Sequence, residues 1–462
     1  MTLRFGTDGV RGLANAELTP ELLLALGRAA ARVFKTGLPG PNGVSGPFFV
    51  GRDTRVSGPL VQAALTAGLA SEGVRVVDLG IIPTPGVAWF SAAEDRPAAV
   101  VSASHNPFPD NGVKFFAPGG RKLSDATEAL LEAELDGILA GVPRTSPVPT
   151  AAEVGTVVRR RDIEPYVAAL AASTEGRTLE GLRIVLDCAN GAASAVAPEV
   201  FQRLGAEVTV IHAEPDGRNI NEGCGSTYPG DLQAAVVQGR ADVGLAFDGD
   251  ADRVLAVDAA GEVIDGDQLI SLLAVDRHAR RALPGDTVVV TVMANLGLRE
   301  AMSSHGIAVA ETSVGDRYVL EALEKGGWAL GGEQSGHIIF RDLATTGDGI
   351  LTGVQVLDVV ARTGRSLADL AAVMTRRPQV LRNVRVARRS LDDADGLWAE
   401  VRAVEERFDG KGRVLIRPSG TEAVVRVMVE APTTEEAEEA CARLSDAVVR
   451  ALGPAPEPSR PA

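Results

Sequence analysis

The sequence contains 462 residues with a formal net charge of −15, and 45% of them are apolar, which predicts about three or four water-soluble domains. The chain is acidic and has no long Lys/Arg block, which argues against a nucleic-acid binder. It also has no apolar run of roughly 18 residues, which argues against a membrane protein. No signal peptide is recognised, so we expect a cytoplasmic location. The three cysteines (Cys188, Cys224 and Cys441) are far apart and lack CxxC spacing, so neither a disulfide framework nor a zinc site is predicted.

The first third of the chain alternates strands, loops and helices. Thr19 and Pro20 provide the N-cap and first turn of a helix whose apolar run continues to residue 33. Ser57 is expected to cap the next helix, which ends near residue 72. We predict strands at 47–50, 74–79, 98–102 and 112–116, and a further helix at 124–139. Three prolines between residues 141 and 150 indicate the first domain boundary.

The middle of the chain continues this alternation in two further units. Strand 182–187, helix 193–204 and strand 207–211 form a βαβ unit, which implies parallel pairing. A buried strand at 242–247 ends at Asp248. The third unit is predicted to contain helices 267–280, 296–305, 316–325 and 349–362 and strands 286–291 and 307–311.

The order of the elements changes after about residue 378. Strands 380–386, 413–416 and 424–431 and helices 393–408 and 434–452 predict a small α+β domain. The fold class is therefore α/β, with three similar α/β domains followed by a C-terminal α+β domain. We expect domain I at 1–155, domain II at 156–255, domain III at 256–372, domain IV at 373–452, and a disordered proline-rich tail at 453–462.

A serine follows the buried strand 98–102, within the sequence Ser102-Ala103-Ser104-His105-Asn106-Pro107. Ligands of α/β proteins commonly bind beyond the carboxyl ends of the strands, so Ser104 is a candidate nucleophile, and a serine that only caps a turn is the alternative. No GxSxG pattern is present, which disfavours a serine hydrolase. Ser102 is a competing nucleophile, one step deeper on the same side of the strand.

Three carboxylates occupy alternate positions in Asp248-Gly249-Asp250-Ala251-Asp252-Arg253. Alternate positions project to one side of an extended segment, and hard oxygen ligands at this density predict a Mg²⁺ site. The later ligands of an EF-hand are missing. A solvated acidic turn is the alternative, although three carboxylates this close would repel one another without a cation.

Two further loops combine glycine with polar side chains. In Gly331-Gly332-Glu333-Gln334-Ser335-Gly336-His337, Glu333 and Ser335 can hydrogen-bond a sugar, although a chance glutamate in a flexible loop fits equally well. The sequence Arg417-Pro418-Ser419-Gly420-Thr421-Glu422, followed by Arg426, suits a phosphate dianion, and an ordinary hairpin turn is the alternative. Together the four loops predict a serine that exchanges phosphoryl groups beside magnesium.

With these motifs the chain resembles the α-D-phosphohexomutases along residues 1–452. The segment Phe5-Gly6-Thr7-Asp8-Gly9-Val10-Arg11-Gly12 is similar to that family's N-terminal signature, and the four loops occur in the family's order, one per domain. The loop sequence GEQSGH resembles the corresponding loop of the branch that acts on glucosamine phosphate. Related enzymes for glucose or mannose phosphates usually have another residue at the position of Gln334. The resemblance implies mixed sheets in the three α/β domains and four domains around a central cleft.

The resemblance also implies an activity and a set of site residues. The activity is an isomerase that interconverts glucosamine 6-phosphate and glucosamine 1-phosphate for peptidoglycan precursors, through phosphorylated Ser104 and a 1,6-bisphosphate intermediate. A hexose or hexosamine 1,6-bisphosphate would activate the enzyme. The implied magnesium ligands are Ser104, through its phosphate, Asp248, Asp250 and Asp252. Arg11 and Lys114 would offset charge on the moving phosphoryl group, and the general base would be His337, Lys114 or His105. Substrate contacts are implied for Arg253, Glu333, Ser335, Arg417, Ser419, Gly420, Thr421 and Arg426.

Three other interpretations stay open at this point. A phosphomannomutase/phosphoglucomutase would share the mechanism and differ in its sugar. A phosphatase with an aspartyl nucleophile would use Asp248 or Asp250 and would not need Ser104. A non-catalytic sugar-phosphate sensor would bind the same ligands without turnover. A homodimer is an assembly that the sequence neither requires nor excludes.

Overall fold

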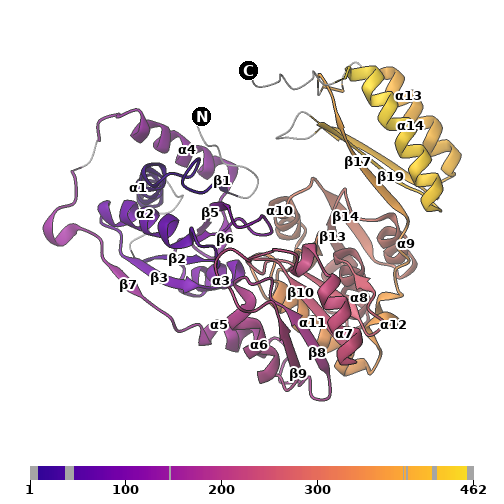
Figure 1. Cartoon of the computed structure of the whole chain (residues 1–462), viewed down its shortest axis with the longest axis horizontal. Helices are drawn as coiled ribbons and strands as arrows, with labels where there is room; N and C mark the ends of the chain where they lie inside the picture. Colours follow the sequence, from indigo (N-terminus) through magenta and orange to yellow (C-terminus); the bar gives the residue numbers. More distant parts are fainter. Residues whose placement is uncertain are drawn as a thin grey trace. The chain divides into compact units, whose positions relative to one another are not determined.

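The computed structural model describes residues 9–36, 46–144, 147–388, 390–391, 394–418 and 424–454. The chain forms two compact units, coloured along the sequence in Figure 1. The larger unit comprises Met1–Met293 and Gly306–Val373, and the smaller unit comprises Ala294–His305 and Met374–Ala462. Within the described ranges, none of the helices is both long enough and apolar enough to cross a membrane.

The first sheet of the larger unit is mixed, with the strand order β1-β5-β4-β2-β3-β7 and β6 paired to β5. Strands β4, β2, β3 and β7 are parallel to one another, whereas β5 runs antiparallel to β4 and β1. The strands are β1 (Val10–Leu13), β2 (Phe48–Arg52), β3 (Val76–Ile81), β4 (Ala98–Val101), β5 (Asp110–Ala117), β6 (Arg121–Lys122) and β7 (Val157–Arg159).

Helices cover both faces of this sheet, because successive side chains of a strand point to opposite sides. Phe48 of β2 packs edge-on against Phe34, with ring centroids 5.4 Å apart, while Phe49 packs against Phe90 at 6.2 Å. Phe34 belongs to α1 (Pro20–Thr36), which shares a buried core with α2 (Gly58–Ser71) and α4 (Asp125–Leu139). Phe90 belongs to α3 (Thr84–Glu94), on the opposite face. The sequence analysis did not predict α3 or β7.

The prediction that Ser57 stands at the start of α2 is confirmed, but its side chain does not cap the helix. Ser57 stands at the N-cap position, but its backbone is already helical there (φ −78°, ψ −13°), and its side chain makes no capping hydrogen bond. Its hydroxyl instead accepts a 2.9 Å hydrogen bond from Nδ2 of Asn111.

The second sheet has the order β12-β11-β10-β8-β9. The predicted βαβ unit is confirmed, since β8 and β9 are parallel and α6 (Ala193–Arg203) connects them. The strands are β8 (Arg183–Asp187), β9 (Glu207–Ile211), β10 (Val243–Phe247), β11 (Val254–Asp258) and β12 (Val263–Ile264), and α5 (Glu164–Ala172) and α7 (Gly230–Gly239) are the other helices of this region.

The third sheet has the order β14-β13-β15-β16. Its strands are β13 (Thr287–Thr291), β14 (Ala308–Thr312), β15 (Leu330–Gly332) and β16 (Ile338–Phe340), and the helices are α8 (Gly266–Ala279), α10 (Asp316–Gly326), α11 (Gly349–Thr363) and α12 (Leu367–Ala371). At two of the predicted domain boundaries, a strand that follows the boundary pairs with the sheet of the preceding domain. Strand β7 follows residue 155 yet pairs with the first sheet, and β12 follows residue 255 yet pairs with the second.

One connection recurs in all three sheets of the larger unit. In each, a strand that is paired in parallel on one side turns back into an antiparallel neighbour, giving the hairpins β4–β5, β10–β11 and β15–β16. The serine, aspartate and GEQSGH motifs lie in the loops of these hairpins, in that order. The sequence motifs therefore occupy equivalent positions in three similar sheets.

The smaller unit has the predicted α+β form. Strands β17 (Gln379–Arg385), β18 (Arg413–Pro418) and β19 (Val424–Glu430) form an antiparallel sheet, which packs through an apolar core with α13 (Asp395–Phe408) and α14 (Thr434–Leu452). Helix α9 (Leu296–Ser304), predicted within domain III, groups with this unit, and N of Leu296 donates to Oε1 of Glu430 at 3.1 Å. Of the predicted tail, Gly453 accepts a hydrogen bond from Ala387. Residues 455–462 lie outside the described residues.

Candidate active site

Ser104 lies in the β4–β5 hairpin loop and is fully buried. Its hydroxyl donates a 2.6 Å hydrogen bond to Oδ2 of Asp248 in the β10–β11 hairpin loop. The backbone of Ser104 is left-handed, with φ +52°, which costs a residue with a side chain about 1–2 kcal/mol. The rest of the loop must therefore hold Ser104 in this conformation.

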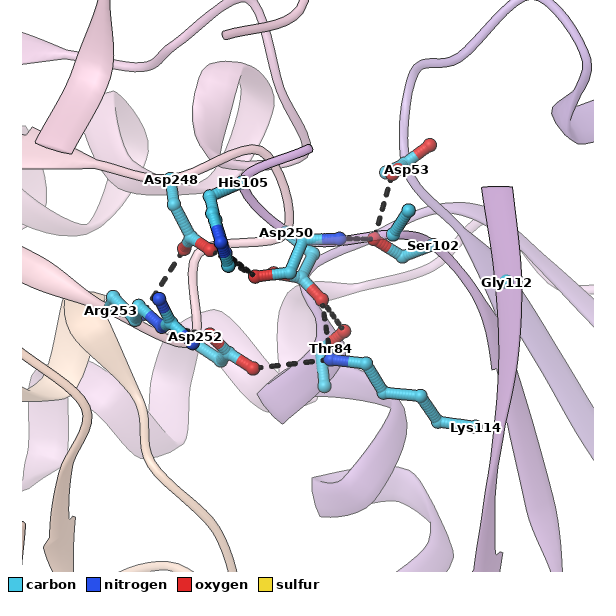
Figure 2. Close-up of polar contacts among 12 residues, drawn as sticks. Asp53, Thr84, Ser102, His105, Gly112, Lys114, Asp248, Asp250, Asp252 and Arg253 are labelled. Carbon is cyan, nitrogen blue, oxygen red and sulfur yellow. Dashed lines mark hydrogen bonds and ion pairs between the residues drawn. The ribbon is translucent and has the colours of Figure 1, made fainter. Parts of the chain in front are cut away.

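Ser102, the competing nucleophile, uses its hydroxyl to support that loop (Figure 2). Its Oγ donates to Oδ2 of Asp53 at 2.7 Å and accepts from the backbone N of Ser104 at 2.9 Å. Ser104, and not Ser102, presents its hydroxyl to the aspartate cluster.

A fully buried arginine also holds this loop. Nε of Arg55 donates to Oδ2 of Asp53 at 2.9 Å. The two terminal nitrogens of Arg55 donate to four backbone carbonyls of the loop, those of Ser104, Asn106, Pro107 and Asp110. Charged donors to backbone carbonyls form strong hydrogen bonds. Sequence analysis missed Arg55 and Asp53, although both follow β2, whose carboxyl end lies beside that of β4.

The three aspartates of the β10–β11 loop are buried, and their carboxylate oxygens lie within 4.8 Å of one another. Thr84, at the start of α3, donates to Oδ2 of Asp250 at 2.7 Å. Burial, followed by repulsion from Asp252 and Asp250, raises the pKa of Asp248 well above its usual range. Lys114 and His337, by contrast, hold the pKa of Asp252 well below its usual range despite burial, so the negative charge that lacks a protein partner is concentrated at Asp248.

The donor set fits a hard divalent cation. Oδ1 of Asp250 and Oδ1 of Asp252 are buried and have no hydrogen-bond donor among the described residues. Carboxylate oxygens are the ligands that Mg²⁺ prefers. The three aspartates could therefore hold a magnesium ion at these unused oxygens.

Two predicted basic residues contact this cluster, and a third contacts the serine loop. The Nζ atom of Lys114, a buried residue of β5, lies 3.1 Å from Oδ2 of Asp250 and 3.3 Å from Oδ2 of Asp252 (Figure 2). Arg11 on β1 donates to the carbonyl of Ala103 at 3.4 Å. The backbone N of Arg253 donates to Asp248 at 3.2 Å, and its Nε lies 3.8 Å from Asp252.

The pKa values of the two histidines of the predicted site are shifted in opposite directions. Nδ1 of His105 lies 3.4 Å from Oγ of Ser104, and burial, together with Arg253 and Arg11, lowers the pKa of His105 to about 4. His337 is buried, with Nδ1 3.7 Å from Oδ1 of Asp252. Burial lowers the pKa of His337, but the nearby negative charge of Asp252 outweighs this effect, and the pKa is raised.

The GEQSGH loop adjoins the aspartate loop. The backbone N of Val254 donates to the carbonyl of Gly336 at 3.1 Å. Oε1 of Glu333 accepts from the backbone N of Gly315 at 3.1 Å, and Ser335 is exposed. Glu333 and Ser335 thus lie on the hairpin next to the one that carries the aspartates.

The predicted phosphate loop belongs to the smaller unit. Ser419, Gly420 and Thr421 lie outside the described residues. Arg417 and Arg426 are directly opposite each other across β18 and β19. Like charges at opposed strand positions repel one another, so an anion beside the pair would relieve this repulsion.

The comparisons with known proteins place these loops in a family. Models described as phosphoglucomutase/phosphomannomutase match the whole domain series: alpha/beta/alpha domain I at residues 2–140, domain II at 164–261, domain III at 265–377 and the C-terminal domain at 381–447. The chain belongs to the phosphoglucomutase/phosphomannomutase family. The resemblance to the phosphohexomutases and the predicted fold class, with three α/β domains and one C-terminal domain, are confirmed.

Members of the family match nearly the whole chain. The phosphoglucosamine mutase of Moorella thermoacetica is 52% identical over 442 residues, which cover 95% of this chain and 98% of that protein. A phosphoglucomutase/phosphomannomutase family protein of Burkholderia thailandensis, solved by crystallography, is 26% identical with a TM-score of 0.80 and covers 98% of both chains. The N-acetylphosphoglucosamine mutase of Aspergillus fumigatus, solved with GlcNAc-6P and magnesium, shares the fold at 22% identity and a TM-score of 0.69, covering 98% of this chain and 96% of that one.

Proposed function

We propose that this chain is a phosphoglucosamine mutase, an isomerase that interconverts glucosamine 6-phosphate and glucosamine 1-phosphate. The observation that carries the mechanism is the buried Ser104 hydroxyl, 2.6 Å from the first of three clustered aspartates. The choice of sugar is supported by the 52% identity to the Moorella thermoacetica mutase. The product would supply UDP-N-acetylglucosamine and peptidoglycan synthesis.

The proposed cofactor is Mg²⁺, held by Asp248, Asp250, Asp252 and a phosphate on Ser104. The buried carboxylate oxygens without donors support this assignment. When bound, magnesium would supply positive charge that stabilises the moving phosphoryl group and the departing serine oxygen.

The proposed reaction begins with phosphorylated Ser104. The bond between Oγ of Ser104 and phosphorus breaks as O1 of glucosamine 6-phosphate bonds to phosphorus, and the O1 proton passes to a general base. The bound 1,6-bisphosphate reorients, and its 6-phosphoryl group returns to Oγ of Ser104 while O6 regains a proton. Lys114 and Arg11 are placed to offset charge on the phosphoryl oxygens.

The general base is proposed among His105, His337 and Lys114. The His105 ring is nearest to the Ser104 hydroxyl and its low pKa keeps it neutral, as a base requires. The ammonium of Lys114 is already engaged by Asp250 and Asp252. Its position beside Ser104 favours His105, although a pKa of about 4 makes it a weaker base than an ordinary histidine.

The sugar can carry phosphate at two positions, and separate loops are proposed to bind the sugar, the reacting phosphate and the other phosphate. Glu333 and Ser335 would bind the sugar in both orientations, and Arg253 would contact the phosphate on Ser104. Arg417, Ser419, Gly420, Thr421 and Arg426 would bind whichever phosphate is not reacting. The opposed pair Arg417 and Arg426 supports this role.

Several attributes of the enzyme belong to the same proposal. We propose a cytoplasmic location, activation by a hexose or hexosamine 1,6-bisphosphate, and domains near 1–155, 156–255, 256–372 and 373–452, with the strand exceptions given above. A homodimer is proposed as the assembly to test by analytical ultracentrifugation, where a single species of monomer mass would overturn it.

The deciding experiment is phosphorus NMR of glucosamine 6-phosphate with the protein, magnesium and a trace of hexose 1,6-bisphosphate. We expect glucosamine 1-phosphate to accumulate with the wild-type protein and not with Ser104→Ala. Glucose 1-phosphate should react more slowly than the amino sugar. Faster turnover of glucose 1-phosphate would reassign the protein to the phosphoglucomutase/phosphomannomutase branch. Release of free phosphate by an active Ser104→Ala variant would contradict the phosphoserine mechanism.

A further inference from the structure

A second group of metal-ligating side chains lies in the second sheet, apart from the aspartate cluster. Asp187 is the last residue of β8, His212 follows β9, and Cys224 precedes the short 3₁₀ helix Gly225–Thr227. One ligand atom from each of these residues lies within 4.8 Å of the other two. Strands β8 and β9 are parallel, so their carboxyl ends bring residues from distant parts of the sequence to one edge of the sheet.

The ring of His212 is oriented by two carboxylates. Nε2 lies 3.2 Å from Oδ2 of Asp231, and Nδ1 lies 3.1 Å from Oδ2 of Asp187. Nδ1 is buried and has no partner with hydrogen-bond geometry among the described residues. When Nε2 carries the proton and faces Asp231, Nδ1 is an acceptor facing the acceptor oxygen of Asp187. A cation between these two atoms resolves the conflict.

The contact between His212 and Asp231 is the arrangement that metal-bound histidines use. A ligating imidazole usually donates its other N–H to a carboxylate, which fixes the ring and the tautomer. The carboxylate of Asp187 is fixed as well, since it accepts from N of Ala189 at 2.9 Å and from N of Gly225 at 2.8 Å. Two of the three ligands are therefore held in place before a metal binds.

Cys224 supplies the ligand that decides the class of metal. Its side chain is fully buried, and Nδ2 of Asn190 lies 3.9 Å from Sγ, within reach of a weak hydrogen bond. A thiolate, an imidazole and a carboxylate together suit zinc, whereas magnesium prefers oxygen ligands alone.

We propose that Asp187, His212 and Cys224 bind one Zn²⁺ ion, with a water molecule as the fourth ligand. On binding, the Cys224 thiol releases its proton to solvent and His212 coordinates as the neutral ring, without any redox change. This site does not depend on the proposed mutase activity. The absence of CxxC spacing led the sequence analysis to predict no zinc site, but the ligands come from three separate loops.

The zinc site would stabilise loops that hydrogen-bond to the serine loop and the aspartate loop of the proposed active site. The backbone N of Asn221 donates to the carbonyl of Ala189 at 3.0 Å, and Nδ2 of Asn221 donates to the carbonyl of Ser104 at 2.9 Å. The backbone N of Ala192 donates to the carbonyl of Gly249 at 2.8 Å. A metal that ties these loops together would thus stabilise the backbone that supports both the serine and the aspartate loops.

Cobalt is the sharpest probe, because a cysteine-bound Co²⁺ gives a near-ultraviolet charge-transfer band that oxygen ligands cannot give. The metal-free full chain is titrated with Co²⁺ and then with Zn²⁺. We expect one equivalent of cobalt to give the band and zinc to abolish it. The band should be lost in Cys224→Ser and kept in Cys188→Ser, a matched control for the neighbouring buried cysteine. Asp248→Asn should also keep it, because the aspartate cluster is a different site.

Asp231→Asn tests the site without altering a buried residue, since Asp231 is 68% exposed. Loss of this outer carboxylate should weaken zinc binding about 10- to 100-fold, measured by competition with a chromophoric chelator. Circular dichroism of each variant separates loss of metal binding from loss of fold. The proposal is overturned by a folded wild-type chain that gives no zinc-reversible band, by a band that survives in Cys224→Ser, or by an Asp231→Asn variant with unchanged zinc affinity.

Discussion

The hydroxyl of Ser104 and the carboxylate of Asp248 are 2.6 Å apart although 144 residues separate them in the sequence. The contact joins the hairpin loops of two sheets and places the proposed nucleophilic oxygen against a buried carboxylate cluster. Burial and the neighbouring carboxylates keep the pKa of Asp248 high when no cation is bound. The charge of this one residue should therefore govern stability, metal binding and activity together.

The first prediction is that Asp248→Asn stabilises the metal-free protein while it impairs the enzyme. Removing one of three repelling carboxylates should raise the melting temperature without magnesium, and should lower kcat about 10²- to 10³-fold. Thermal melts with and without magnesium check this. A variant that magnesium stabilises as much as the wild type would contradict the assignment of Asp248 as a ligand.

The same residue sets a pH dependence. Because the folded-state pKa of Asp248 is raised, the stability that it contributes is present at low pH and is lost as the pH rises through the folded-state value. Saturating magnesium should remove this loss. Melting temperatures across pH 5–8, with chelator or with magnesium, should therefore diverge as the pH rises.

A second prediction concerns Arg55, whose guanidinium binds four carbonyls of the serine loop. Arg55→Lys keeps a positive charge beside Asp53 but cannot span those carbonyls, so we expect about 3 kcal/mol of lost stability and at least a tenfold fall in kcat. Arg382→Lys is the matched control, because its ion pair with Glu438 is exposed, and it should change stability by less than about 0.5 kcal/mol. Equal effects of the two substitutions would contradict the role of Arg55.

A third prediction separates catalysis from metal binding. Lys114 occupies one oxygen each of Asp250 and Asp252. Lys114→Met should lower kcat about 10²- to 10³-fold, because positive charge near the phosphoryl group is lost. Magnesium affinity should stay the same or increase, since a competing cation is removed. Isothermal titration with magnesium and activity against magnesium concentration measure the two effects; a parallel fall of both would mean that Lys114 organises the metal site.

A fourth prediction is that His105 titrates far below an ordinary histidine. Burial, Arg253 and Arg11 lower its pKa to about 4, so the ring should stay neutral down to about pH 5. An unfolded histidine binds its proton near pH 6.5, so this residue should make the fold less stable as the pH falls from about 6.5 to about 4. NMR of the ring nitrogens, assigned with His105→Gln, measures the midpoint; a value near 6.5 would exclude the environment described above.

A fifth prediction uses the buried carboxyl of Asp348, which accepts a 2.7 Å hydrogen bond from the Tyr166 hydroxyl. Burial raises the pKa of Asp348 to about 6. The stability that this group contributes is therefore lost as the pH rises from about 4 through about 6. Asp348→Asn imitates the protonated form and should stabilise the protein at pH 7 by up to about 3 kcal/mol, with no gain near pH 4. A gain that is the same at both pH values would contradict the prediction.

The strongest local patterns predicted the elements that carry the motifs. The apolar run before Asp248 is strand β10, and all of its residues are buried, because a strand covered on both faces needs no polar positions. Helix α3 was missed because Thr84-Pro85-Gly86 looks like a turn, yet Pro85 stands in the first turn of the helix, where a missing N–H costs nothing.

The parts of the site that the sequence did not predict depend on contacts between distant segments. Arg55 looks like one more charged residue after a strand, and only the fold shows that it is fully buried against the serine loop. Thr84 reaches Asp250 across 166 residues. Strand ends that share a sheet edge are the one signal that could have drawn attention to residues 53–55.

The three hairpins of the larger unit have a consequence for how such enzymes diversify. The ends of each loop are fixed by an antiparallel strand pair, so side chains within one loop can be exchanged while the flanking strands keep their pairing. With the proposed assignment of sugar binding to the β15–β16 loop, sugar preference would change mainly through substitutions in that loop, while the proposed phosphoryl-transfer residues stay in the other two hairpins.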